Sequence, residues 1–179
     1  KECIGLLNFN LENDDKILVK PSITAPAYPY QAVNTNPEFL NALFGILDDC
    51  GVKKENIIVA EQALIGSNAV DAASKSGILD VCKKHGISFL DISKGPFEEI
   101  DADGFKFRVY REALRRKIIN APIMKTNFQI GLSGALENLS RLTDEKTQRE
   151  MYYNNLDITL PKLSKYLEVF TIADATNGL

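Results

Sequence analysis

The chain has 179 residues, of which 45% are hydrophobic and 25% are charged, a composition typical of a globular protein with one well-buried core. Its net charge of -3 lacks the basic surplus of a nucleic-acid-binding domain, so we expect no nucleic-acid partner. No apolar stretch approaches the ~20 residues that span a membrane, so we expect no membrane partner either.

Five short apolar runs, separated by helical stretches, predict the buried strands of a parallel sheet. They cover residues 17–19, 57–60, 87–90, 118–122 and 169–173. The charged residues that end or follow these runs are, in order, Lys20, Glu61, Asp91, Lys125 and Asp174. We therefore expect an α/β fold with a mainly parallel sheet and helices on both faces. The carboxyl ends of such strands share one edge of the sheet, where ligands bind.

The first half of the chain adds helices and a long connection to these strands. Its elements are strands at 3–7 and 16–20, a connection at 21–36 and helical regions at 37–50 and 69–85. The proline-rich connection is either a binding loop or a fixed surface loop, and both interpretations remain open. Asn36 and Pro37 predict a helix start, because Asn caps the first turn and Pro suits its first position. The second helical region is expected to break near Gly77.

The second half of the chain contains a predicted insertion. Alternating side chains on either side of a glycine-containing turn predict a β-hairpin at 97–110. The remaining elements are a short helix at 111–116, a helix that starts within 131–134 and runs to 139, a helix at 156–167 and a last strand that ends at Asp174. We expect residues 1–179 to form a single α/β domain, truncated from a longer chain.

The cysteines and the histidine do not predict a metal centre. Cys3, Cys50 and Cys82 form no Cys-x-x-Cys pair, and their odd number argues against a disulfide framework. We expect buried free thiols in a reducing, cytoplasmic setting. His85, the single histidine, follows two lysines and precedes Gly86, a pattern typical of a helix C-terminus. Neither a Ser-His-Asp triad nor a metal ligand is therefore assigned.

The lysines near the strand ends predict an anion site. Lys20 and Lys125 lie at or after apolar runs, where burial without a partner is costly. Further hydrogen-bond donors are expected from Thr126, Asn127 and Ser133, together with free backbone N–H groups at the predicted helix start. The chain has no Walker loop. The alternative is a structural network in which both lysines pair with carboxylates.

Three carboxylates, Glu61, Asp91 and Asp174, follow strands at the same predicted edge. Clustered carboxylates bind a hard cation or act as general acid and base. The sequence does not establish that the three converge. For Asp91, a helix cap or a solvated strand end is the better explanation.

The order of motifs resembles the uncharacterised family called "domain of unknown function 362", from about Asp15 to Leu179. The family's segments correspond here to Lys20-Pro21-Ser22, Thr35-Asn36-Pro37, Ala60-Glu61, Asp71 to Ile78, Asn120 to Asn127, Leu136-Glu137-Asn138 and Ala173-Asp174-Ala175. The most specific is Asn-x-Pro-Lys-x-Lys-Thr-His, in which Lys125 and Thr126 match. The resemblance implies motif residues at Lys20, Glu61, Lys125 and Asp174, and gives Asp91 no support.

The chain departs from that family pattern at several positions. Asn127 stands where the family has histidine, Ile123 and Glu137 stand where it has lysines, and Glu61 replaces an aspartate. Positive charge is thus lost at two places, and any function that uses the histidine is altered here. A weaker resemblance, in residues 57–60, is to the amino-terminal domain of the nickel-pincer lactate racemase family. That family's histidine-rich signature is absent from this chain.

These observations lead to one functional hypothesis and two alternatives. We expect a small anionic ligand or cofactor at the carboxyl edge of the sheet, bound by Lys20, Glu61, Lys125, Thr126, Asn127, Ser133 and Asp174. The alternatives are an enzyme that uses a strand-end carboxylate as general base and a non-catalytic protein-interaction module. The family resemblance implies an association with iron–sulfur or redox metabolism, with any cluster outside this fragment. No catalytic residue, cofactor or oligomeric state is assigned.

Overall fold

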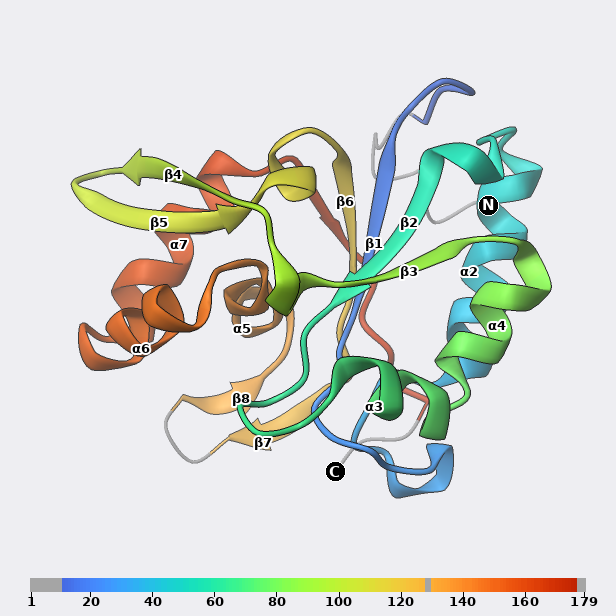
Figure 1. Ribbon diagram of the computed structural model, residues 1–179, viewed down its shortest axis with the longest axis horizontal. Helices are drawn as coiled ribbons and strands as arrows, with labels where there is room; N and C mark the ends of the chain where they lie inside the picture. The colour runs from blue at the N-terminus through green and yellow to red at the C-terminus, as the bar shows by residue number, and fades with distance from the viewer. Residues whose placement is uncertain (1–10, 128–129, 177–179) are drawn as a thin grey trace.

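A five-stranded parallel sheet forms the centre of the computed structural model, which describes residues 11–127 and 130–176 (Figure 1). Its strands are β1 (Ile17–Pro21), β2 (Ile57–Glu61), β3 (Ser88–Asp91), β6 (Lys117–Ala121) and β9 (Val169–Thr171). The spatial order is β3-β2-β1-β6-β9, and every neighbouring pair is parallel. The predicted parallel sheet is confirmed, and all five apolar runs supply its strands.

The strand order places a switch point beside β1. The chain moves outward from β1 to β2 and β3 on one side, and later to β6 and β9 on the other. In open α/β sheets, the crevice at the carboxyl ends of the two strands that flank such a reversal is the usual ligand site. The carboxyl ends of β1 and β6 are therefore where a site is expected.

Helices cover both faces of the sheet, as predicted (Figure 1). One face carries α2 (Pro37–Asp49), α3 (Ala69–Lys75) and α4 (Ile78–His85). The other carries the hairpin of β4 (Phe97–Ala102) and β5 (Phe105–Tyr110) with α5 (Ala135–Leu139), α6 (Glu145–Tyr153) and α7 (Leu156–Tyr166). Successive residues of β1 serve opposite faces, with Val19 in the first core and Leu18 in the second.

Local sequence signals set the boundaries of the first three helices. The side chain of Asn36 accepts a hydrogen bond from the backbone N–H of Glu38 and caps α2. Gly77, at a φ of 79°, separates α3 from α4, because this left-handed backbone suits glycine. His85 lies in the last turn of α4 and contacts the side chain of Asn41, so its predicted structural role is confirmed.

The predicted hairpin is confirmed, with Phe97 opposite Tyr110, whereas the region that follows β6 differs from expectation. Residues predicted to open a helix instead form β8 (Gly131–Ser133), which pairs with β7 (Lys125–Asn127), and the helix starts only at Ala135. The polar stretch before α7 contains α6, for which no helix was predicted. The strand predicted at 3–7 lies outside the described residues.

Short 3-10 helices complete the structure. They are η1 (Pro29–Gln31), η2 (Lys54–Asn56), η3 (Ile92–Lys94), η4 (Arg111–Leu114) and η5 (Ser140–Leu142). Over residues 11–127 and 130–176, no helix has both the length and the apolar character required to cross a membrane.

Candidate functional site

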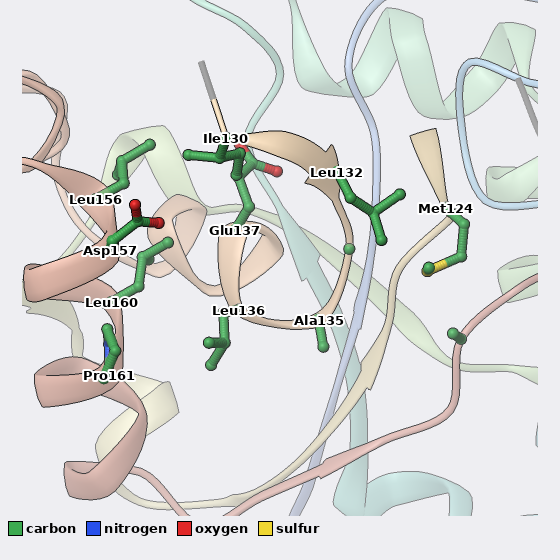
Figure 2. Close-up of a pocket in the computed structure, with 12 residues that line it drawn as sticks. Met124, Ile130, Leu132, Ala135, Leu136, Glu137, Leu156, Asp157, Leu160 and Pro161 are labelled. Atoms are coloured by element: carbon green, nitrogen blue, oxygen red, sulfur yellow. The ribbon is translucent and has the colours of Figure 1, made fainter. Parts of the chain in front are cut away.

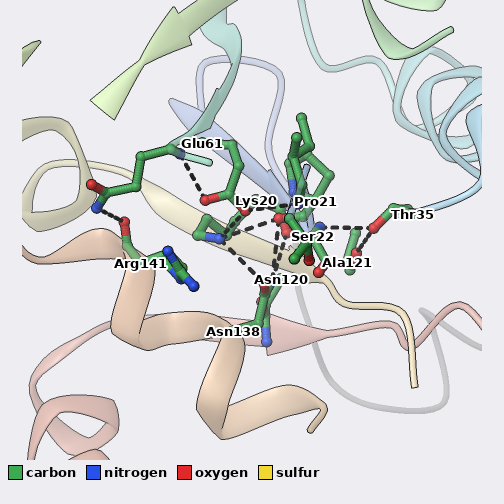
Figure 3. A network of polar contacts seen from close by, with 12 residues as sticks. Lys20, Pro21, Ser22, Thr35, Glu61, Asn120, Ala121, Asn138 and Arg141 are labelled. Atoms are coloured by element: carbon green, nitrogen blue, oxygen red, sulfur yellow. Dashed lines mark hydrogen bonds and ion pairs between the residues drawn. The ribbon is translucent and has the colours of Figure 1, made fainter. Parts of the chain in front are cut away.

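A buried ion pair lies at the carboxyl ends of β1 and β2 (Figure 3). The Lys20 ammonium bonds the Glu61 carboxylate, and both side chains are almost fully excluded from solvent. Lys20 also donates to the carbonyl oxygen of Pro21 at 3.2 Å and to Oδ1 of Asn138 at 3.3 Å. The second oxygen of Glu61 accepts the backbone N–H of Gln62 at 2.8 Å. The adjacent strands thus bring together two of the predicted site residues.

Burial acts on both members of this pair. Loss of water lowers the pKa of Lys20 and raises the pKa of Glu61, because each neutral form is easier to bury than its ion. The attraction between the two charges opposes both shifts. The charge of Arg141 lies close enough to lower the pKa of Lys20 further. The cation of Lys20 is therefore matched by a carboxylate inside the protein.

Two asparagines close the crevice between β1 and β6. The Asn138 amide, from α5, donates to the carbonyl oxygens of Lys20 at 3.2 Å and Pro21 at 3.3 Å, and to Oδ1 of Asn120 at 2.8 Å. Asn120 in turn donates to the carbonyl oxygen of Ala135 at 2.8 Å. The switch point is therefore occupied by polar side chains of the protein itself.

A cavity of about 350 Å³ lies above this network. Its lining includes five of the seven predicted site residues: Glu61, Lys125, Thr126, Asn127 and Ser133. The other lining residues are Ser22, Ile23, Thr24, Leu64, Glu137, Asn138, Arg141 and Tyr152. We call this cavity the polar pocket. Lys20 is not among its lining residues, because its ammonium is buried beneath the pocket against Glu61.

Lys125, the first residue of β7, provides one cation of the polar pocket. Its half-buried ammonium donates to Oγ1 of Thr24 at 2.7 Å, to the carbonyl oxygen of Val33 at 3.1 Å and to Oγ of Ser22 at 3.4 Å. All three acceptors are neutral, and no carboxylate of the described residues lies within salt-bridge distance of it. Burial lowers the pKa of Lys125. The predicted network in which both lysines pair with carboxylates therefore holds for Lys20 alone.

Arg141, in η5, provides the second cation. Its Nη1 donates to the carbonyl oxygen of Ala63 at 3.3 Å, while its own carbonyl oxygen accepts Nε2 of Gln62 at 2.6 Å. Figure 3 shows the side chain extending from its helix toward Lys20. A guanidinium has five N–H donors, so this contact leaves most of them available to the pocket.

A carboxylate faces the same space. Glu137, on α5, accepts Oγ of Ser133 at 2.6 Å and the hydroxyl of Tyr152 at 3.0 Å. Burial, together with the charge of Glu137, raises the pKa of Tyr152 to about 12, so the tyrosine remains a hydrogen-bond donor. No binding role was predicted for Glu137, Arg141 or Tyr152. Glu137 was noted only because it differs from the lysine of the family pattern, and no sequence signal pointed to Arg141 or Tyr152.

Asp174 lies away from the polar pocket. It is fully buried, but its carboxylate accepts the backbone N–H of Asn36 at 2.7 Å and both the N–H and the hydroxyl of Thr176. It therefore orders the start of α2 and does not line the pocket. Asp91 caps η3 by accepting the N–H of Ser93 at 3.0 Å, as the sequence predicted. The three strand-end carboxylates do not form one cluster.

An apolar cavity of about 400 Å³ shares only Glu137 with the polar pocket (Figure 2). Its apolar side chains come from the β7–β8 region, α5 and α7, and include Leu132, Leu136, Leu156 and Leu160. Leu132 and Leu136 are 56% and 45% exposed, which is high for leucine. Because neighbouring residues of a strand point to opposite sides, β8 directs Leu132 to this cavity and Ser133 to the polar pocket.

Neither metal ligation nor thiol chemistry has support in this structure. In the described ranges, no group of three or more His, Cys, Asp or Glu side chains is placed to hold a metal ion. Cys50 and Cys82 are free thiols, and burial raises the pKa of Cys82 to about 12, far from that of a reactive thiolate. Cys3 lies outside the described residues.

Two comparisons with known proteins bear on this site. A family model described as "Domain of unknown function (DUF362)" matches residues 17–179, which include every residue of both cavities. A search of curated proteins finds no match to the chain. The resemblance to the lactate racemase family gains no support from these comparisons and stays a prediction.

Proposed function

Since this chain belongs to the DUF362 family, whose description assigns no activity, we propose a function from the pocket itself: the domain binds a small anionic ligand between Lys125 and Arg141. The ligand site is the polar pocket at the carboxyl edge of the sheet. Lys20 lies beneath the pocket and does not contact the ligand, whereas Glu61 lines the pocket with both oxygens already hydrogen-bonded. Asp174 has no part in binding.

The environment of Lys125 is the observation that carries this proposal. The ammonium of Lys125 is half-buried, its three hydrogen-bond acceptors are neutral, and the charges of Glu137 and Glu61 act on it without a direct salt bridge. Arg141 adds a second cation to the same lining. Burial lowers the pKa of Lys125 most, the charges of Glu137 and Glu61 raise it, and the charge of Arg141 lowers it further. A carboxylate or phosphate between the two would relieve this repulsion and gain charge-assisted hydrogen bonds.

The rest of the lining suits a small polar ligand. Thr126 and Asn127 of β7 and Ser22 after β1 supply hydroxyl and amide groups around the two cations. A volume of about 350 Å³ lies at the lower end of the range for small-molecule sites. We therefore expect a compact metabolite and not an extended cofactor.

Fewer observations favour the two alternative functions, an enzyme and a protein-interaction module, than favour anion binding. Glu61 is the strand-end carboxylate that lines the pocket, but both of its oxygens already accept hydrogen bonds, which limits its use as a general base. An interaction module would use the apolar cavity beside Leu132 and Leu136. Both alternatives, and a role in iron–sulfur or redox metabolism, stay predictions.

Anions are expected to raise the melting temperature of the protein through Lys125. Succinate or sulfate at ten times its dissociation constant would stabilise the fold by about 1.4 kcal/mol, or roughly 3–6 °C for a chain of this size. Lys125→Met keeps the aliphatic stem but removes the ammonium, so the anion-dependent shift should disappear. Differential scanning fluorimetry across a panel of dicarboxylates and oxyanions measures it.

Lys83→Met is the matched control for that experiment. Lys83 is an exposed lysine on α4 that lines none of the described cavities, so the same loss of charge should leave the anion-dependent shift intact. A panel in which no anion stabilises the wild type would contradict the proposal. An equal shift in Lys125→Met would also contradict it, because the anion would then bind elsewhere.

Anion affinity is expected to fall at alkaline pH, and to begin falling at a lower pH than it would for a lysine with the ordinary pKa of 10.5. The pKa of Lys125 is below 10.5 in the folded protein, and Lys125 attracts the ligand only in its charged form. Above that pKa, the affinity should fall about tenfold per pH unit, because each binding event must restore one proton. Calorimetric titration with succinate, a dianion throughout this range, measures the effect.

Unfolding of the protein would not account for the loss of anion affinity at alkaline pH. Between the lowered pKa of the folded state and the ordinary value of the unfolded state, the folded protein binds fewer protons at Lys125. The contribution of this group to stability therefore rises with pH across the same window. Circular dichroism should show an intact fold where affinity is already falling, and a constant affinity up to pH 10.5 would contradict the role of Lys125.

A further inference from the structure

We infer that the ligand of the polar pocket is a zwitterion, an amino carboxylate or a similar amine-bearing anion, with Glu137 holding its ammonium group. This inference rests on the proposed function, since Lys125 and Arg141 hold the anionic part. It adds the chemical class of the ligand and a third binding residue.

Glu137 is held open toward the pocket by neutral donors. Its two oxygens accept the hydroxyls of Ser133 and Tyr152. In the described part of the chain no cation forms a direct salt bridge with it, and its charge acts on Lys125 and Lys20 only at longer range. Each oxygen retains a free lone pair, because a carboxylate has about four acceptor sites. An unpaired carboxylate in a pocket is thus available to an incoming ammonium group.

Glu137 and Arg141 carry opposite charges and line the same pocket, but they do not form a salt bridge with each other. Glu137 lies on α5 and Arg141 four positions later on η5. Here Glu137 is occupied by Ser133 and Tyr152, while Arg141 donates to Ala63 and is fixed through Gln62. Opposite charges that could neutralise each other are instead kept apart in one cavity.

The resulting charge pattern discriminates between ligand classes. Lys20 neutralises Glu61, so the pocket presents two cations, Lys125 and Arg141, and one carboxylate, Glu137. A simple dianion would gain at the cations but would be repelled by the carboxylate. A ligand with an ammonium beside its anionic group complements both, and such complementarity gives specificity. The small volume keeps the two groups within one compact molecule.

Matched ligand pairs test this inference. Aspartate is compared with succinate, and glutamate with glutarate, by isothermal titration calorimetry on the wild type, with both enantiomers of each amino acid. We expect the amine to tighten binding about tenfold for at least one pair, from one charge-assisted contact. Glu137→Gln should abolish this gain, while the parent dicarboxylate binds at least as tightly as before because the repulsion is removed.

Glu150→Gln is the control for the loss of one negative charge. Glu150 lies exposed on α6, pairs with Lys146 and lines none of the described cavities, so this variant should keep the preference for the amine. Tyr152→Phe retains the Glu137 charge and should also keep a preference. The wild-type comparison stands alone if Glu137→Gln fails to fold.

The outcomes separate the inference from the proposed function. Dicarboxylates that bind through Lys125 with no gain from the amine would overturn the inference and leave the anion site standing. A gain that persists in Glu137→Gln would also overturn it, because another group would then hold the amine. If neither ligand of any pair binds the wild type, the proposed function fails, and the inference fails with it.

Discussion

Lys20→Met is expected to lower the free energy of unfolding by about 3–5 kcal/mol at neutral pH, because it leaves a buried carboxylate without its cation. The Glu61 side chain is 1% exposed, and its oxygens bond Lys20 and the backbone N–H of Gln62. Methionine fills the volume of the lysine stem but offers no charge. Urea denaturation monitored by circular dichroism measures the loss.

The dependence of this loss on pH is part of the prediction. In the variant, the Glu61 carboxyl keeps a pKa raised above 4.5, because burial then acts without the opposing attraction of Lys20. A group with a raised folded-state pKa contributes stability that is complete below its unfolded pKa and lost as pH rises through the folded one. The cost of Lys20→Met should therefore shrink toward pH 4.5, where the carboxyl can be buried neutral.

A double-mutant cycle isolates the pair. Lys20→Met combined with Glu61→Gln removes both charges and should cost less than Lys20→Met alone, since no buried ion remains. Lys146→Met is the surface control, because its partner Glu150 is exposed and such pairs contribute little. A single variant as stable as the wild type at neutral pH, or strictly additive effects in the cycle, would show that the pair does not stabilise the fold.

The central strands of the sheet were predictable because they are buried on both faces. β1 and β2 are buried along their whole length, so their sequences appear as uninterrupted apolar runs followed by charge. That pattern located Lys20 and Glu61 at one edge of the sheet. Their contact depends on β1 and β2 being neighbours, and the sequence carries no direct signal of strand order.

Asp174 shows the limit of the same reasoning. It follows an apolar run like the others, but the strand ends earlier, at Thr171, and Asp174 then bonds the backbone of Asn36. The predicted convergence of strand-end charges assumed that each charge directly follows its strand. Ile123 shows a related limit. It is buried, its backbone forms a β-bridge with Asp174, and it does not line the polar pocket, so of the two lost lysines only the one replaced by Glu137 changes the charge of the pocket.

The pocket residues outside the strands could not be located from hydrophobic patterns. Tyr152 comes from α6, whose buried face includes Thr147 and Gln148, so its helical period lacks an apolar stripe. The signal that remained was Asp144, which caps the helix by accepting the N–H of Thr147. Ser133 was predicted as a site residue, but at a helix start. It instead lies on a strand of three residues, too short to show alternation.

Asn138→Leu is expected to cost about 2–4 kcal/mol of stability, because it orphans one or two buried polar groups at ~1–3 kcal/mol each. Asn138 is 4% exposed and joins β1 to β6 through Lys20, Pro21 and Asn120. The Asn120 oxygen and the Lys20 ammonium each lose a partner inside the switch point. Leucine has the same branched arrangement of side-chain heavy atoms and is larger than asparagine, so the loss does not come from a cavity.

Asn154→Leu provides the comparison for an amide with the same type of bond in an exposed position. Asn154 donates to the carbonyl oxygen of Glu150 at 2.7 Å at the end of α6, where water can replace the bond, so its effect should stay within about 0.5 kcal/mol. Equal effects of the two variants in urea denaturation would contradict a stabilising role for Asn138. A larger loss in Asn138→Leu would instead show that the amides at the β1–β6 switch point stabilise the fold by joining the two strands.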